Sequence, residues 1–376
     1  MLERPSGGQR AVIVGLAIGA RRNDPDLDEI AALATSAGAT IVGRVGGRRA
    51  APDPALYAGR GKVDEIARAR DTAAADLVIF DHALSGVQQR NLEQALSCRV
   101  VDRTSLILDI FAQRARSAEG KLQVELAQLA HLSTRLVGGW THLERQKGGI
   151  GLRGPGETQL ETDRRLIGKR VKTLKERLAK VTTSRGVQGR TRRRARVRAV
   201  ALVGYTNAGK STLFNRLARA KVYAADQLFA TLDTTLRRIH VPGADAIVLS
   251  DTVGFIRDLP HDLVAAFRAT LSEAARADLI VHVIDASASD RDAQAEAVEE
   301  VLADIGADAL PRLAVLNKID AAGLDPGVER DPCGTIRTVR ASALTGAGCA
   351  GFLAALAERF PADAAHADAD AADASA

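Results

Sequence analysis

The chain has 376 residues, of which 46% are hydrophobic and only 3% aromatic, and its formal net charge is +6. This length predicts two or three domains with cores of Ala, Val, Leu and Ile. The apolar stretches are too short to span a bilayer, Met1–Arg10 has no apolar signal core, and Cys98, Cys333 and Cys349 lack metal-binding spacing. These features argue against a membrane protein or a disulfide scaffold, and they predict a cytoplasmic protein with no membrane partner.

Apolar strands and amphipathic helices alternate over residues 10–112. The predicted strands are Ala11–Ile18, Thr40–Val45, Leu77–Phe80 and Arg99–Val101. The predicted helices are Asp28–Ser36, Lys62–Thr72, Val87–Leu96 and Ser105–Gln113. This alternation predicts a small N-terminal α/β domain with a largely parallel sheet.

Residues 113–197 are predicted to form a helical hairpin with a glycine-rich loop and a basic linker. Apolar residues repeat at three- and four-residue steps from Gly120 to Leu136 and again from Leu160 to Val181, as in a helix–helix seam. The loop between them, about residues 138–158, is rich in glycine and charge, and a loop of this length inside a compact protein is usually functional or disordered.

Basic side chains crowd the second helix and the linker after it. They are Arg164, Arg165, Lys169, Arg170, Lys172, Lys175, Arg177, Lys180, Arg185, Arg190, Arg192, Arg193, Arg194, Arg196 and Arg198. Such a density attracts a polyanion, although a solvated linker would look the same. Few aromatic residues lie nearby, which favours the backbone of structured RNA over stacking on single strands.

A phosphate-binding loop of the form G-x-x-x-x-G-K-[ST] follows the predicted buried strand Arg198–Val203 and precedes a predicted helix, Ser211–Ala218. This context is what the motif requires, because loop N–H groups and the helix N-terminus then surround phosphate. We expect Lys210 to reach the β- and γ-phosphates and the Ser211 hydroxyl to ligate Mg²⁺. The predicted contacts are Gly204, Tyr205, Thr206, Asn207, Ala208, Gly209, Lys210, Ser211 and Thr212.

A second motif, Asp251-Thr252-Val253-Gly254, ends the apolar strand Ala246–Ser250. Its four residues are predicted nucleotide contacts: the Asp251 carboxylate can hold Mg²⁺, and the Gly254 N–H can bind a γ-phosphate until hydrolysis removes it. We expect a threonine of the segment Phe229–Thr235 to close over the metal. We favour Thr231, with Thr234 and Thr235 as alternatives. The predicted metal ligands are therefore Ser211, Thr231 and Asp251, and the predicted catalytic residues are Lys210, Thr231 and Gly254.

Two further motifs predict a choice of guanine. Asn317-Lys318-Ile319-Asp320 ends the strand Arg312–Asn317, which follows the strand Leu279–Asp285. Asp320 can accept bonds from guanine N1–H and the 2-amino group, Asn317 can brace the site, and the stem of Lys318 can cover the ring. Ser342-Ala343-Leu344 follows the strand Thr335–Arg340, and the Ala343 N–H can meet guanine O6. The motifs together predict a protein that binds GTP and GDP and hydrolyses GTP.

Residues 198–361 are predicted to be a doubly wound P-loop GTPase domain with its site at the carboxyl ends of the strands. Residues 362–376, rich in Ala and Asp, are predicted to be a disordered acidic tail.

With these motifs the chain resembles the HflX family of translational GTPases over roughly residues 10–360. The resemblance also rests on three segments outside the GTPase motifs: Gly59-Arg-Gly-Lys-Val-Asp-Glu-Ile66, Val101-Asp-Arg-Thr-Ser-Leu-Ile-Leu-Asp-Ile-Phe111 and Lys147-Gly-Gly-Ile-Gly-Leu-Arg-Gly-Pro-Gly-Glu-Thr-Gln-Leu-Glu-Thr-Asp-Arg-Arg165. The chain departs from the family pattern at Thr234, where a proline is expected.

The resemblance implies a monomer that binds the large ribosomal subunit and its rRNA rather than DNA, and that splits or rescues stalled or idle ribosomes. Phe255 stands where many GTPases have a water-orienting glutamine, so intrinsic hydrolysis should be slow. Asn207 matches a K⁺-coordinating position of potassium-activated GTPases, or it simply caps the loop. Two other functions stay open: an RNA-remodelling GTPase acting away from the ribosome, and a ribosome-binding module that uses GTP only as an affinity switch.

Overall fold

The structure is a computed structural model, and it describes residues 9–19, 27–139, 162, 164–181, 197–219, 228–244, 246–257 and 274–362. By its internal contacts the chain divides into two compact units, Met1–Leu178 and Ala179–Ala376. Residues 140–158 of the loop predicted at about 138–158, the linker residues 182–196 and residues 363–376 of the tail predicted at 362–376 lie outside the described residues.

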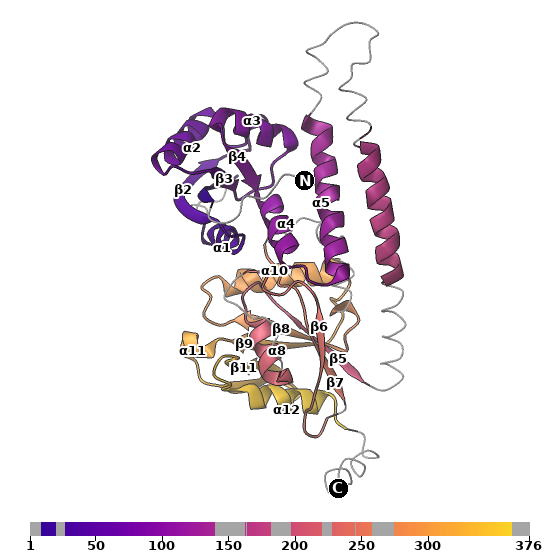
Figure 1. The fold of residues 1–376 in the computed structure, drawn as a ribbon. Helices are drawn as coiled ribbons and strands as arrows, with labels where there is room; N and C mark the ends of the chain where they lie inside the picture. Colours follow the sequence, from indigo (N-terminus) through magenta and orange to yellow (C-terminus); the bar gives the residue numbers. More distant parts are fainter. Residues whose placement is uncertain are drawn as a thin grey trace, which may run out of the picture. The chain divides into compact units, whose positions relative to one another are not determined.

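The first unit contains a four-stranded sheet in the order β2-β1-β3-β4, with every pair parallel (Figure 1). The strands are β1 (Arg10–Ile18), β2 (Thr40–Arg49), β3 (Leu77–Phe80) and β4 (Arg99–Asp102). The helices between and after them are α1 (Asp28–Ser36), α2 (Arg60–Thr72), α3 (Gly86–Leu96) and α4 (Arg103–Arg114). The predicted α/β fold with a parallel sheet is confirmed, and β2 runs past the predicted end because it pairs with β1 as far as Arg49.

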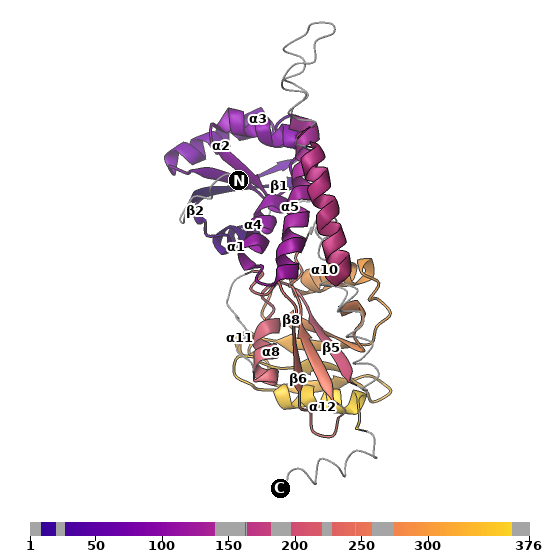
Figure 2. The ribbon, with the colours of Figure 1, turned by 45° about the vertical axis from the view of Figure 1, so that its right-hand side comes forward.

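The hairpin begins with α5 (Ala118–Gly139), which lies against α3 and α4 (Figures 1 and 2). Asp102, fully buried at the end of β4, accepts the Ser105 N–H as the N-cap of α4 and pairs with Arg135 of α5 at 2.7 Å. A second helix, residues 164–181, is joined to α5 by the ion pair between Arg170 and Glu125, and its Leu174 is fully buried.

The face of α5 that is most deeply buried differs from the predicted leucine seam. Gln123, Val124 and Ala127 are almost inaccessible, whereas Leu122 and Leu126 are only partly buried. Because α5 packs against α3 and α4, it buries a face with smaller residues that the spacing of leucine does not mark.

The second unit contains a seven-stranded sheet in the order β10-β11-β9-β8-β5-β7-β6. The strands are β5 (Arg198–Val203), β6 (Thr235–Ile239), β7 (Ile247–Asp251), β8 (Leu279–Asp285), β9 (Arg312–Asn317), β10 (Gly327–Arg330) and β11 (Ile336–Arg340). The described helices are α8 (Lys210–Ala218), α10 (Arg291–Asp304), α11 (Ile319–Ala322) and α12 (Cys349–Arg359). The five inner strands are parallel, as the predicted doubly wound fold requires.

The two edge strands, β6 and β10, are antiparallel to their neighbours and were not predicted from the sequence. Both are short and carry exposed charged side chains, such as Arg237 and Glu329, so they lack the apolar run by which buried strands are recognised. The helices α8 and α12 pack on this sheet, because Phe214 and Phe352 lie in one buried cluster with residues of its strands. Of the helices that the structure describes, none is both long and apolar enough to cross a membrane.

Candidate nucleotide-binding site

The phosphate loop leaves the carboxyl end of β5, the strand between β7 and β8, and its glycines are required by close approach. Gly204 has φ +153°, and a Cβ there would lie 2.1 Å from the carbonyl oxygen of Val283. Gly209 has φ +89°, and a Cβ there would lie 2.2 Å from Nδ2 of Asn317. Any larger residue would therefore push the loop away from the neighbouring strands.

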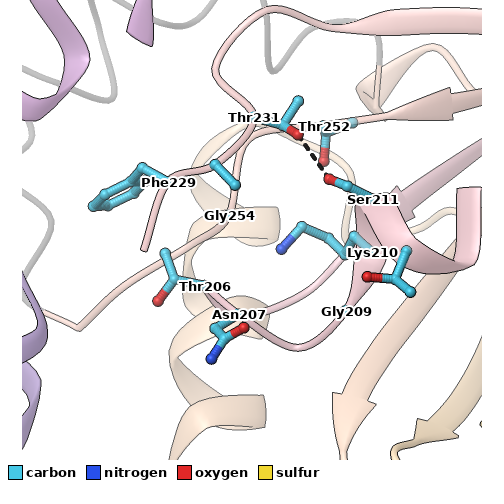
Figure 3. A pocket seen from close by; sticks show the side chains of 11 residues that line it. Thr206, Asn207, Gly209, Lys210, Ser211, Phe229, Thr231, Thr252 and Gly254 are labelled. Carbon is cyan, nitrogen blue, oxygen red and sulfur yellow. Dashed lines mark hydrogen bonds between the residues drawn. The ribbon is translucent and has the colours of Figure 1, made fainter. Parts of the chain in front are cut away.

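Lys210, the first residue of α8, is buried beneath this loop (Figure 3). Its ammonium group donates to the carbonyl oxygens of Gly204 at 3.0 Å and Tyr205 at 2.7 Å. Burial lowers the pKa of Lys210 to about 8, and the charge of Asp251 opposes that change. Because the lysine side chain has a flexible stem and a compact charge, Lys210 can approach phosphate oxygens that bind in the loop.

Three oxygen-bearing side chains from distant parts of the sequence converge next to Lys210. Ser211 Oγ donates to Asp251 Oδ2 at 2.6 Å and lies 2.7 Å from Thr231 Oγ1, a contact drawn in Figure 3. Thr231 Oγ1 lies 3.1 Å from the same carboxylate oxygen. Burial raises the pKa of Asp251, while the Ser211 hydrogen bond and the Lys210 charge lower it.

The other two candidate threonines lie differently. The hydroxyl of Thr234 is buried and has no hydrogen-bond partner among the described residues, and Thr235 is the first residue of β6, where it pairs with Asp251 through the strand register. Of the three, Thr231 is the one whose hydroxyl contacts Ser211 and Asp251.

The convergent oxygens fit a small hard cation. Oδ1 of Asp251 is buried without a hydrogen-bond partner in the described part of the chain, so the carboxylate has a free acceptor next to two hydroxyls. Mg²⁺ prefers such oxygen ligands and keeps several waters, so one carboxylate and two hydroxyls are enough protein ligands. Within the described ranges, no group of three or more His, Cys, Asp and Glu side chains could hold a metal.

The segment after Asp251 lies directly on the phosphate loop. The N–H of Thr206 donates to the carbonyl of Phe255 at 2.7 Å, and the N–H of Phe255 donates to the carbonyl of Gly204 at 3.1 Å. A Cβ at Gly254 would lie 2.9 Å from the Cα of Thr206, so only glycine fits there. The Phe255 side chain is completely buried and cannot orient a water molecule.

Thr252 and Val253, both predicted nucleotide contacts, are also buried. The Thr252 hydroxyl donates to the carbonyl of Leu202 at 2.7 Å, so it joins β7 to β5. The hollow over the phosphate loop is lined by loop residues between Thr206 and Thr212 and by Phe229, Ala230, Thr231, Thr252 and Gly254 (Figure 3). Phe229 and Ala230 were not among the predicted site residues.

The guanine motif joins the phosphate loop to the turn after β11. Asn317, at the end of β9 and almost inaccessible, donates from Nδ2 to the carbonyl of Ala208 at 2.8 Å and accepts the Ala343 N–H on Oδ1 at 2.9 Å. The Ala343 N–H, which we expected to meet guanine O6, thus bonds to Asn317 in this structure. Asp320 is exposed in the first turn of α11, where its carboxylate is accessible to a base.

Lys318 is held by Asp285, which was not among the predicted site residues. Its ammonium group lies 2.7 Å from Oδ2 of Asp285, the last residue of β8, and Ser287 donates twice to the other oxygen of that carboxylate. These bonds keep the pKa of Asp285 low against the effect of burial. Asp285 ends the predicted strand Leu279–Asp285, so its place at the carboxyl edge of the sheet could have marked it as a site residue. In the turn after β11, Ser342 is buried, whereas Leu344 is 71% exposed.

A glycine loop between a strand and a helix, a buried aspartate at the end of the adjacent strand, and an Asn-Lys-x-Asp motif two strands away define a P-loop GTPase. Three family profiles agree: "GTP-binding GTPase N-terminal" matches residues 24–112, "GTP-binding GTPase Middle Region" matches 114–193, and "50S ribosome-binding GTPase" matches 199–318.

The GTPase HflX of Escherichia coli K12 is 55% identical to the chain over 361 residues, which are 96% of this chain and 85% of that protein. The GTPase HflX of Caldanaerobacter subterraneus subsp. tengcongensis is 49% identical over 324 residues, covering 86% of this chain and 76% of that protein. The chain therefore belongs to the HflX family of GTPases, and the predicted GTP binding and hydrolysis are confirmed at this level.

A crystal structure titled as a complex of SsGBP and GDP aligns with a TM-score of 0.51 and 22% sequence identity. The alignment covers 94% of this chain and 98% of that chain. At this identity the alignment shows a shared fold over nearly the whole chain.

Proposed function

We propose that this GTPase associates with the large ribosomal subunit through its N-terminal and helical regions and helps to split or rescue stalled or idle ribosomes. The observation that carries the proposal is the helix at 164–181, which has eight basic residues and one acidic residue. Seven of the basic side chains are exposed and outside the ion pair of Arg170: Arg164, Arg165, Lys169, Lys172, Lys175, Arg177 and Lys180. An exposed row of cations on one helix favours the phosphate backbone of rRNA.

The match of residues 199–318 to "50S ribosome-binding GTPase" and the HflX relationship support a ribosomal partner. We also propose that the protein acts in the cytoplasm, as a monomer, and does not bind DNA. Its proposed segments are an N-terminal α/β domain at 10–112, the hairpin and linker at 113–197, the GTPase domain at 198–361 and an acidic tail at 362–376.

In the proposed nucleotide complex, the loop Gly204–Ser211 surrounds the phosphates with N–H groups at the start of α8. Lys210 turns from the loop carbonyls to the β- and γ-phosphates, and Thr231 and Gly254 contact the γ-phosphate side. Asp320 binds the guanine edge while the stem of Lys318, anchored to Asp285 at 2.7 Å, covers one face of the ring.

Ser211, Thr231 and Asp251 are the proposed ligands of Mg²⁺, which would neutralise charge that develops on the phosphates. The chain itself contributes positioning and electrostatic stabilisation. Because Phe255 is buried and apolar, the water must be oriented by another group, so hydrolysis by the free protein is slow and a partner raises it. Asn207, in a left-handed conformation with φ 62°, is the residue to examine for a dependence on K⁺.

The proposal is tested by co-sedimentation of the full chain with large subunits, small subunits and free rRNA, in GDP and in a non-hydrolysable GTP analogue. Lys172→Gln/Lys175→Gln should weaken pelleting, because it removes two exposed charges from the basic helix. Arg291→Gln/Arg337→Gln removes two exposed charges from the other unit and serves as the matched control.

Pelleting with large subunits that needs the analogue, and a rise in GTP turnover when those subunits are added, would support the proposal. Equal binding to large subunits, small subunits and free rRNA, regardless of nucleotide, would favour an RNA-remodelling GTPase instead. Selective binding without any rise in turnover would favour the affinity-switch function.

A further inference from the structure

Arg216, on the helix that follows the phosphate loop, contacts the backbone turn that contains the Ser342-Ala343-Leu344 motif. Its Nε donates to the carbonyl oxygen of Ala343 at 2.9 Å, and its terminal NH2 group donates to the carbonyl oxygen of Leu344. The turn comes close to this side chain: a Cβ at Gly346 would lie 3.0 Å from the guanidinium. A residue of the phosphate helix therefore binds two consecutive carbonyl groups 127 and 128 positions away in the sequence.

The remaining polar groups of the turn are bound from other directions. The N–H of Ala343 donates to Asn317 at 2.9 Å, the N–H of Thr345 donates to the hydroxyl of Ser342 at 3.0 Å, and the N–H of Gly346 donates to the carbonyl of Ser342 at 2.8 Å. With the two carbonyl bonds from Arg216, successive peptide groups of the turn each have a fixed orientation.

The contact with Arg216 also sets the direction of an N–H group. A trans peptide group is planar, and its N–H points opposite to its C=O. The structure contains no cis peptide bond in its described residues, so the N–H of Leu344 points away from the carbonyl of Ala343 and hence away from α8. The side of the turn opposite Arg216 thus presents one backbone donor, the N–H of Leu344, whose side chain is exposed.

We propose that Arg216 is a positioning residue for guanine recognition: it holds the turn at 342–346 so that the N–H of Leu344 is directed at the O6 atom of the base. This inference rests on the proposed nucleotide site and deepens it. O6 is the acceptor that distinguishes guanine from adenine at that position, where adenine has an amino donor. A turn whose Leu344 N–H is fixed in place discriminates between them, whereas a loose turn can rotate a carbonyl toward an amino group.

Removing the guanidinium should weaken recognition of the base and leave the fold intact. Arg216 is an exposed residue at the surface, so water can replace it at the two carbonyls. The turn then gains conformations in which the N–H of Leu344 does not point at O6. Contacts to the phosphates and to the N1–H and 2-amino edge involve other residues and should not change.

The test measures dissociation constants of the full chain for GDP, 6-thio-GDP and inosine diphosphate. In 6-thio-GDP sulfur, a weak acceptor, replaces O6, while inosine diphosphate keeps O6 and lacks the 2-amino group. For Arg216→Ala we expect the preference for GDP over 6-thio-GDP to fall by roughly three- to tenfold, the size of one hydrogen bond. The preference for GDP over inosine diphosphate should stay the same, and Arg216→Lys should restore part of the loss.

Arg359→Ala is the matched control, because Arg359 also binds two backbone carbonyls of this unit, those of Arg312 and Ile336. It should leave both preferences unchanged. If Arg216→Ala weakened all three nucleotides by the same factor, or weakened none, the positioning role would be wrong. If the unaltered protein bound none of them, or if Lys210→Ala did not weaken GDP, the proposed nucleotide site itself would fail instead.

Discussion

The replacement of Asn317 by alanine is expected to be one of the most damaging single changes in the GTPase unit. Asn317 is 1% exposed and is the only side chain that the structure shows bonded to both Ala208 and Ala343 in the described residues. Its removal leaves the carbonyl of Ala208 and the N–H of Ala343 in a buried place without their partner. It therefore disconnects the phosphate loop from the turn after β11.

The size of the effect follows from these two groups. A buried polar group without a partner costs about 1–3 kcal/mol, so two of them predict a loss of about 2–6 kcal/mol in the free energy of unfolding. That is a large part of the roughly 5–15 kcal/mol that stabilises a typical domain. Asp320→Ala is the control from the same motif: Asp320 is exposed, so its removal should weaken guanine binding and leave unfolding unchanged.

The assay combines urea unfolding of the full chain with hydrogen exchange read by mass spectrometry on peptides from 198–219 and 336–346. In Asn317→Ala both peptides should exchange faster and the unfolding midpoint of this unit should fall, while peptides from the first unit stay unchanged. Exchange in 336–346 that matches the unaltered protein would refute the reasoning, because the Ala343 N–H would then be protected without Asn317.

Three further outcomes are expected. His282 is buried, and burial together with the charges of Arg312 and Lys210 lowers its pKa to about 4 from an ordinary 6.5. The unfolded chain then binds the proton first, so the free energy of unfolding should fall between pH 6.5 and 4, by at most about 3 kcal/mol. Acid titration of His282→Gln should show a shallower decline. Ser211→Ala should remove most of the Mg²⁺-dependent gain in GDP affinity and leave the affinity in EDTA unchanged, and an equal loss in both conditions would contradict a metal ligand. On the hairpin, Leu174→Ala should lower the free energy of unfolding of the first unit by about 2–5 kcal/mol, since Leu174 is fully buried. Arg170→Ala, which breaks an exposed ion pair on the same helix, should give no measurable change in thermal unfolding.

The sequence by itself determined the chemical class of this protein. The phosphate site can be recognised from Gly204, Gly209 and Gly254, because a Cβ at each would collide with backbone or with a neighbouring side chain. Few residue patterns can therefore make such a site. The inner strands were predictable for a related reason. A parallel strand covered on both faces must be an almost continuous apolar run, as in Leu279–Asp285.

Only the tertiary structure decided which distant groups meet. The three threonines at 231, 234 and 235 are chemically equivalent in the sequence. Only the path of the folded chain brings Thr231 Oγ1 to 2.7 Å from Ser211 Oγ. The same holds for Asp285 beneath Lys318 and for Arg216 at the turn after β11. Charged side chains occur throughout the surface, so a sequence carries no local mark of a long-range contact. Such pairs exist because the sheet places its carboxyl ends side by side, a property of the assembled fold and not of any segment.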